Sequence, residues 1–372
     1  MGGGIMTRER VELRQVVDGL RSEGLLPENS DDTVTAFFEN LHETQPWYIR
    51  TMVGFGAWLA SLLLIGFVGS IGFAADIGFV IVGVLFIGGA IFARLKLGND
   101  FVVQSALASS LAGQALLAYG IVEVTGGNDF ESVLGIVIVL NGILFFVFPD
   151  RTHRVLSILI AMSSLGFLLY SWELNAVVPI LGPVIAAAMV FFYQRQGVII
   201  ARGKGHLIGP LVTGLMLTAF GFLLLSTVYI LPELRWEFAF YPRPWISSIL
   251  LGALLLYVGT RVWPQIGDVA GSRERAVFYG LLVAITAAAW AIPGLLLALI
   301  VIMLGASSGN RVFTGAGIVF LVVFIATYFY GIQVSMLTKS ITLVATGATV
   351  LAARWILLKV TAGPVEGGAS HA

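Results

Sequence analysis

The 372-residue sequence contains no cysteine, and only 11% of its residues are charged, against about 25% in an ordinary soluble domain. The absence of cysteine excludes disulfides, thiolate metal sites and cysteine nucleophiles. Hydrophobic residues make up 58% of the chain, and a further 44 residues are glycine. This composition excludes a soluble globular enzyme and is typical of a chain dissolved in lipid.

The sequence also lacks several motifs that mark enzymes and nucleotide-binding proteins. It has no HExxH zinc motif, no P-loop and no GxGxxG placed between a strand and a helix. The basic residues are dispersed among short loops, and the four histidines are isolated in sequence; they are His42, His153, His206 and His371. We therefore expect no enzymatic activity, no catalytic or metal site, no cofactor and no nucleic-acid binding.

The first 51 residues differ in character from the rest of the chain. They carry five Lys/Arg and nine Asp/Glu, a net charge of −4, whereas the remainder carries a net charge of +4. Apolar residues recur at helical spacing from Leu13 to Leu20 and again from Val34 to Leu41. We predict an acidic cytoplasmic two-helix head at residues 1–51, and we do not expect a secretory signal.

The remainder of the chain is divided into apolar segments by polar residues, glycine and proline. A bilayer core of about 30 Å needs about 20 apolar residues per helix. Twelve segments approach this length, which predicts an all-α polytopic membrane bundle over residues 52–358 and a flexible cytoplasmic tail at 359–372. The approximate segment cores are 52–73, 77–93, 101–122, 132–148, 155–172, 176–193, 207–231, 245–263, 274–291, 293–306, 312–330 and 338–358.

The distribution of basic residues favours twelve spans over eleven. With the N-terminus inside, 18 of the 21 Lys/Arg fall on the cytoplasmic side, Arg235 and Arg243 fall outside, and Lys339 lies within the last span. Merging the two segments that flank Pro293 would move Arg311 to the outside. We therefore expect both termini to lie in the cytoplasm.

A weak internal repeat is a further feature of the sequence. An offset of 211 residues aligns segments 77–93 and 101–122 with segments 293–306 and 312–330, and it aligns Gly83 with Gly294. Many transporters are built from repeats around a midplane site that broken helices form. The interruption at Pro293-Gly294 is a candidate for such a break, and an ordinary turn is the alternative interpretation.

Charged residues and histidines are absent from the middle of every predicted span. Lys339, followed by Ser340, lies about two residues into the last span, and Glu123 is one of several acidic residues in the outer loops. In one interpretation, the acidic residues form an outer rim that attracts cations, and Lys339 is their counter-charge within the span. In the other, Lys339 extends its ammonium group to the membrane surface and the acidic residues are ordinary loop residues. Uncharged polar residues within the spans are expected to join helices; they are Gln104, Gln114 and Asn141.

Motifs near both ends of the membrane region resemble those of a known family. The first is Pro46-Trp47-Tyr48-Ile49-Arg50, and the others are Pro293-Gly294 and Lys339-Ser340. The chain resembles a bacterial multi-pass membrane family catalogued as domain of unknown function 4401. This resemblance implies a bacterial inner (plasma) membrane protein without an assigned activity, which belongs to an assembly with other membrane proteins.

Three functional interpretations remain open. The first is a non-enzymatic subunit or scaffold of a membrane complex, because the acidic head and the lack of midplane charge suit docking better than ion coupling. The second is a permease for a neutral or apolar small solute, which the span count and the proline-broken helices favour. The third, an enzyme acting on lipid headgroups, lacks paired acid and base residues. The candidate functional residues are Lys339, Ser340, Pro293, Gly294, Glu123, Trp47, Tyr48 and Arg50.

Overall fold

The computed structural model describes residues 77–96, 100–127, 129–174, 177–228, 243–266, 272–290 and 292–331, with isolated helical positions between 52 and 66 and between 337 and 344. Over these residues the chain is helical apart from short connections, and no strand occurs among them. The all-α prediction is therefore confirmed. The predicted head and tail lie outside the described residues, as do Trp47, Tyr48, Arg50 and Lys339.

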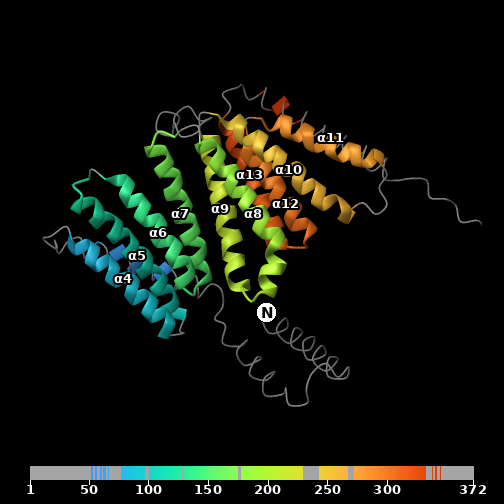
Figure 1. Ribbon diagram of the computed structural model, residues 1–372. Helices are drawn as coiled ribbons and strands as arrows, with labels where there is room; N and C mark the ends of the chain where they lie inside the picture. The colour runs from blue at the N-terminus through green and yellow to red at the C-terminus, as the bar shows by residue number, and fades with distance from the viewer. Residues whose placement is uncertain are drawn as a thin grey trace, which may run out of the picture.

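Ten helices follow one another along the described ranges (Figure 1). They are α4 (Ile77–Lys96), α5 (Asp100–Val124), α6 (Phe130–Val147), α7 (Arg151–Ser171), α8 (Val178–Ala201), α9 (Gly205–Val228), α10 (Pro244–Ile266), α11 (Ser272–Ala288), α12 (Pro293–Ser307) and α13 (Arg311–Gly331). The seven from α4 to α10 are long and apolar enough to cross a membrane, and α11 to α13 contain shorter apolar helices. The chain is therefore a multi-pass membrane protein.

Helix boundaries follow local capping chemistry. Asp129 and Asp150 precede α6 and α7, and each carboxylate accepts a hydrogen bond from a backbone N–H of the first turn. Gly203 and Gly309 take φ angles of 76° and 68° in the turns after α8 and α12, a conformation that side chains with a Cβ rarely adopt. Pro293 occupies the first position of α12, so the predicted interruption there is confirmed.

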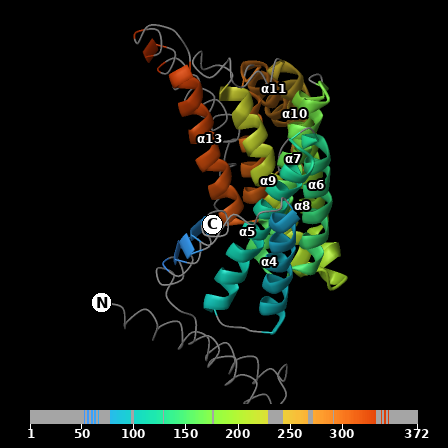
Figure 2. The ribbon, with the colours of Figure 1, turned by 90° about the vertical axis from the view of Figure 1, so that its left-hand side faces the viewer.

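The main hydrophobic core lies where α8, α9, α10, α12 and α13 meet. α12 runs through it, and Leu296, Leu297 and Ile300 on this helix are fully buried. α7 joins this group to α6, and α4 and α5 form a close pair at the other side of the bundle (Figure 1). Figure 2 shows α6, α7, α9 and α13 running roughly alongside one another. α11 instead lies across one end of the bundle, inclined to α8 and α9 (Figure 1).

The 211-residue offset relates one contact in the α4–α5 pair to one contact in the α12–α13 pair. In the α4–α5 pair, Gly83 lies against the backbone of Gly113, and in the α12–α13 pair, Gly294 lies against the ring of Phe324. Gly113 and Phe324 are separated by the same offset as the two glycines. Residues at this offset are therefore in contact in both pairs, through backbone atoms in one and a side-chain ring in the other, and the repeat itself stays a prediction.

The Gly83 crossing leads to a first prediction. A Cβ on Gly83 would lie 2.7 Å from both the carbonyl oxygen of Gly113 and the backbone N of Leu117, and backbone atoms cannot rotate out of the way as side chains do. We expect Gly83→Val to lower the free energy of unfolding by about 1–3 kcal/mol, because α4 and α5 must separate. Thermal unfolding of the purified protein in detergent measures this loss.

Gly88 on the same helix is the matched control for Gly83. Nothing lies within 4 Å of the position that a Cβ on Gly88 would occupy, so Gly88→Val adds the same side chain without a collision. Equal midpoints for the two variants would show that the close crossing of α4 and α5 does not contribute to stability.

Candidate functional site

The candidate residues from the sequence do not meet in one site. Pro293 and Gly294 are buried at the start of α12. Glu123 is exposed near the end of α5, and Ser340 is exposed at an isolated helical position. Among the described candidates, the structure therefore brings together only Pro293 and Gly294, which are adjacent in sequence. The described residues do not include a cluster of acidic side chains that would form the proposed outer rim.

A buried polar cluster instead occupies the start of α7, where we had predicted a cytoplasmic loop. The predicted span began at residue 155, but α7 begins at Arg151, and its first turns include His153 and Arg154. Both side chains are buried. The helix begins four residues before the approximate predicted core because Asp150 caps it before its apolar part begins.

His153 is fully buried and joins two helices. Its Nε2 lies 2.8 Å from the Oγ of Ser110 on α5, and its Nδ1 lies 3.1 Å from the Oγ of Ser157 on its own helix. The imidazole also stacks on the ring of Phe148, with 3.9 Å between the ring centroids. Both ring nitrogens therefore have hydrogen-bonding neighbours inside the bundle, which satisfies this polar group where water is scarce.

Arg154 donates to two backbone carbonyls that proline leaves without a helical donor. Its Nε lies 3.0 Å from the carbonyl oxygen of Phe145, and its Nη1 lies 3.2 Å from that of His206. In an α-helix each carbonyl accepts from the N–H four residues later. For Phe145 and His206 those residues are Pro149 and Pro210, which have no N–H. The guanidinium therefore supplies the donors that the two prolines remove.

Ser247 on α10 has the same relationship with α8. Its hydroxyl donates to the carbonyl oxygen of Pro179 in the first turn of α8. The helical donor to that oxygen would be residue 183, which is a proline inside the helix. Ser247 is fully buried, so its hydroxyl replaces a backbone hydrogen bond that water cannot replace.

Ser248, the next residue of α10, contacts the break between α11 and α12. Its Oγ lies 3.1 Å from the carbonyl oxygen of Ala289 and 2.9 Å from that of Trp290. Pro293 stands four residues after Ala289 and has no N–H to donate, but the backbone N–H of Ile292 donates to the Ala289 carbonyl at 3.0 Å, so Ser248 is a second donor there. The sequence pointed to Pro293, but not to Ser248, because only the fold brings α10 against the break.

We call three of these acceptors, the carbonyls of Phe145, Pro179 and His206, the proline-freed carbonyls. An unsatisfied backbone carbonyl in a membrane interior costs several kcal/mol. Two buried side chains, Arg154 and Ser247, bind all three of them, and Ser248 bonds to carbonyls at the break before α12. Their hydrogen bonds hold broken helix ends in place, which is structural chemistry and does not activate a nucleophile.

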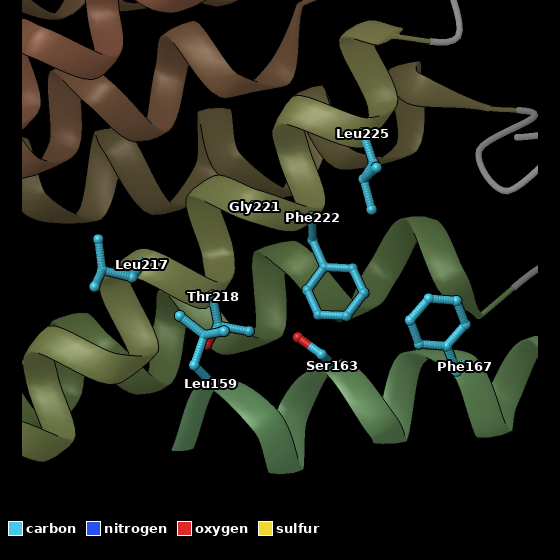
Figure 3. Close-up of a pocket in the computed structure, with 8 residues that line it drawn as sticks. All are labelled: Leu159, Ser163, Phe167, Leu217, Thr218, Gly221, Phe222 and Leu225. Atoms are coloured by element: carbon cyan, nitrogen blue, oxygen red, sulfur yellow. The ribbon is translucent and has the colours of Figure 1, made fainter. Parts of the chain in front are cut away.

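A groove between α7 and α9 opens on the side of the bundle (Figure 3). Its volume is about 320 Å³. It opens sideways, since Phe167 and Gly221 are exposed, and Gly221 contributes no side chain to fill it. Its walls are apolar except for the hydroxyls of Ser163 and Thr218. The lining residues are Leu159, Ser163, Phe167, Leu217, Thr218, Gly221, Phe222 and Leu225.

A second hollow follows one face of α6. Its six lining residues recur three or four positions apart, which is the spacing of a single helix face; they are Ser132, Gly135, Ile136, Val139, Leu140 and Ile143. Nothing lies within 4 Å of a Cβ built on Gly135. This face of α6 therefore has a shallow hollow at Gly135, and no other described segment packs tightly against it.

The described residues do not gather the groups that metal binding needs. Three or more His, Cys, Asp or Glu that could hold a metal ion do not occur together among them. The pentapeptide Gly305–Gly309 has the spelling of a nucleophile elbow, GxSxG, but it lies at the end of α12 rather than after a strand. The Ser307 hydroxyl there donates to the carbonyl of Leu304, as an ordinary helix-end serine does.

Comparison with protein families gives a match over most of the chain. A family model described as "Domain of unknown function (DUF4401)" matches residues 46–360, which is most of the chain. The matched range includes both end motifs on which the resemblance rested. No curated protein and no solved structure matches the chain.

Proposed function

Because the chain belongs to the DUF4401 family, whose description assigns no activity, we propose a function from the structure itself. The protein acts as a non-enzymatic subunit or scaffold of a membrane complex. Its partners are the lipid bilayer and other integral membrane proteins of the same assembly.

The placement of polar groups and hollows supports this proposal. The buried donors Arg154, Ser247 and Ser248 are bound to backbone carbonyls, so they hold the bundle together. The grooves between α7 and α9 and along α6 both lie on the outside of the bundle. Lateral apolar grooves with glycine in their walls suit the approach of a transmembrane helix from another chain. This lateral placement is the observation that carries the proposal.

The topology that we propose extends the described helices to the whole chain. The seven described spans, α11 to α13 and the two outermost apolar segments make twelve crossings of a bacterial inner membrane, with both termini in the cytoplasm; in this topology α11, which is inclined across one end of the bundle in the structure, turns to cross the membrane with its neighbours. The excess of Lys/Arg on the cytoplasmic side supports this orientation. The acidic head then lies on the same side, where it is available to a cytoplasmic or membrane partner.

The composition of the gently purified, tagged protein tests the subunit proposal. We expect a membrane protein to copurify in stoichiometric amount, as measured by size and mass spectrometry of the complex from native membranes. A version without residues 1–45 separates a contribution of the head from one of the membrane region. A lone monomer or homo-oligomer, unchanged by the deletion, would overturn the proposal.

The groove between α7 and α9 provides a more local test. Gly221→Leu fills the groove from its α9 wall, and we expect it to reduce the recovered partner at least about tenfold, which corresponds to about 1.4 kcal/mol of binding free energy. Gly197→Leu on α8 is the control, because Gly197 is also exposed with nothing within 4 Å of its Cβ position. Equal recovery with both variants would exclude this groove as the interface.

The broken helix at Pro293 favours a second candidate, a permease for a neutral or apolar solute. Broken helices with buried polar groups form the sites of many transporters, and Ser248 is such a group at this break. Since the chain has no cysteine, Ser248→Cys gives a single labelling site. Labelling by membrane-impermeant thiol reagents from both sides of the membrane in turn would support the permease. Protection from both sides would favour the subunit.

A further inference from the structure

Three buried polar side chains lie at one level of α5, α6 and α7. Asn141 stands six residues before the end of α6, and Ser157 stands six residues after the start of α7. The two helices are antiparallel around the short connection 148–150, so both residues lie about 9 Å from that connection along the helix axes. The third side chain is Gln114 on α5.

A hydrogen bond sets the level of Gln114. Ser110 on α5 bonds to His153 on α7, so these two positions lie side by side. Gln114 is one helical turn beyond Ser110, and Ser157 is one turn beyond His153 in the same direction. Gln114, Asn141 and Ser157 therefore belong to one layer of the three helices.

The amide groups of this layer are buried without sufficient hydrogen bonds. Gln114 is 7% exposed and Asn141 is 1% exposed. Both amide atoms of Gln114, and the Oδ1 of Asn141, have no hydrogen-bond partner among the described residues. The Nδ2 of Asn141 donates to the carbonyl of Val137 on its own helix. Leaving three such atoms unsatisfied in a membrane interior would cost several kcal/mol.

We propose that this layer is a binding site for a buried water molecule that bridges Gln114 and Asn141. The site needs a guest that donates to the two amide oxygens and accepts from the Nε2 of Gln114, and water does both. A cation would lack a counter-charge, because the acidic residues of α5 and α6 stand near the helix ends and α7 has none. Two amide oxygens at the same level disfavour an anion.

Hydrogen bonds between polar side chains connect the α4–α5 pair to the rest of the bundle, and we call this connection the polar joint. The bound water completes it. α5 packs closely against α4, where Gly83 and Gly113 let the backbones touch, and it meets α6 over a much smaller surface. The bond from Ser110 to His153 forms one half of this joint. The water between Gln114 and Asn141 forms the other half, one turn farther along.

A double-mutant cycle in the full-length protein tests this site. If water bridges the two amides, Gln114→Leu and Asn141→Leu each remove one of its ligands, and each lowers the midpoint of thermal unfolding by about 2–4 °C. The double variant loses little more than either single variant, because the water is already lost. Gln104→Leu, on the same helix two to three turns away, is the control whose effect adds to that of Asn141→Leu.

The direction of the shifts and an experimental density map distinguish the outcomes. Leucine variants that are more stable than the parent would overturn the proposed water site, since the amides would then be unsatisfied in the parent. Losses of stability that simply add in the double variant would also overturn it, since the two amides would then act independently. A map of the parent protein in lipid nanodiscs should show a solvent feature within hydrogen-bonding distance of both amides. A direct contact between the two amides in that map would also overturn it.

Discussion

Replacing Arg154 by methionine is expected to lower the free energy of unfolding by about 3–6 kcal/mol. The estimate follows from two hydrogen bonds with a charged donor, each worth about 1.5–3 kcal/mol. Methionine keeps an unbranched apolar stem but leaves the carbonyls of Phe145 and His206 without this donor. Thermal or denaturant unfolding of the purified protein measures the loss, and poor accumulation in the membrane would accompany it.

Proline replacements supply a specific control for this loss. Pro210→Ala returns a backbone N–H that reaches the carbonyl of His206, so we expect it to recover about 1 kcal/mol in the Arg154→Met background. Pro183→Ala, which restores a donor to a different carbonyl, should recover nothing there. If both replacements have the same effect on Arg154→Met, the guanidinium does not act by replacing the lost backbone donor.

Hydropathy and length predicted most of the described fold. Each of the ten segments predicted between residues 77 and 330 corresponds to a described helix, and the two segments around Pro293 are separate helices, α11 and α12. This succeeds because a helix is the only open element that satisfies its own backbone in lipid, so apolar length alone identifies it. The orientation of α11 across one end of the bundle depends on packing, which segment length does not reveal.

The polar cluster at the start of α7 could not be read from hydropathy. A hydropathy window excludes residues such as His153 and Arg154 and assigns them to the nearest loop. A local signal was nevertheless available, because Pro149-Asp150 followed by polar residues is a typical helix start, with aspartate as the N-cap. That signal extends the helix to include both residues, but it cannot reveal that Ser110 and His206 lie beside them.

The proline-freed carbonyls show where sequence reasoning ends. A proline inside a helix identifies the acceptor it leaves free, four residues earlier, so Pro183 points to the carbonyl of Pro179, whereas the Ala289 carbonyl before Pro293 accepts from the N–H of Ile292. The side-chain donors at both breaks are not local. Ser247 and Ser248 are more than 40 residues away along the chain in both cases, and only the packing of α10 against α8 and α12 brings them to these carbonyls.

The serine pair on α10 gives the second large expected effect. Ser247→Ala and Ser248→Ala together should lower the free energy of unfolding by about 1.5–4.5 kcal/mol, from about 1–3 kcal/mol for the Pro179 carbonyl left unsatisfied and about 0.5–1.5 kcal/mol for the lost hydrogen bond of Ser248. The two hydroxyls hold the start of α8 and the break before α12, and both regions adjoin the main core. Unfolding of the double variant in detergent measures the combined loss.

Separate variants assign this loss to the two carbonyls. Pro183→Ala restores a backbone donor to Pro179, so it should recover the Ser247→Ala part and leave the Ser248→Ala part unchanged. Ser307→Ala is the matched control, because its hydroxyl bonds within its own helix and its loss should cost little. A double variant as stable as Ser307→Ala would mean that the carbonyls at both breaks find other donors. The prolines of α8 and α12 would then not depend on α10, and the break at Pro293 would be free to move as a permease requires.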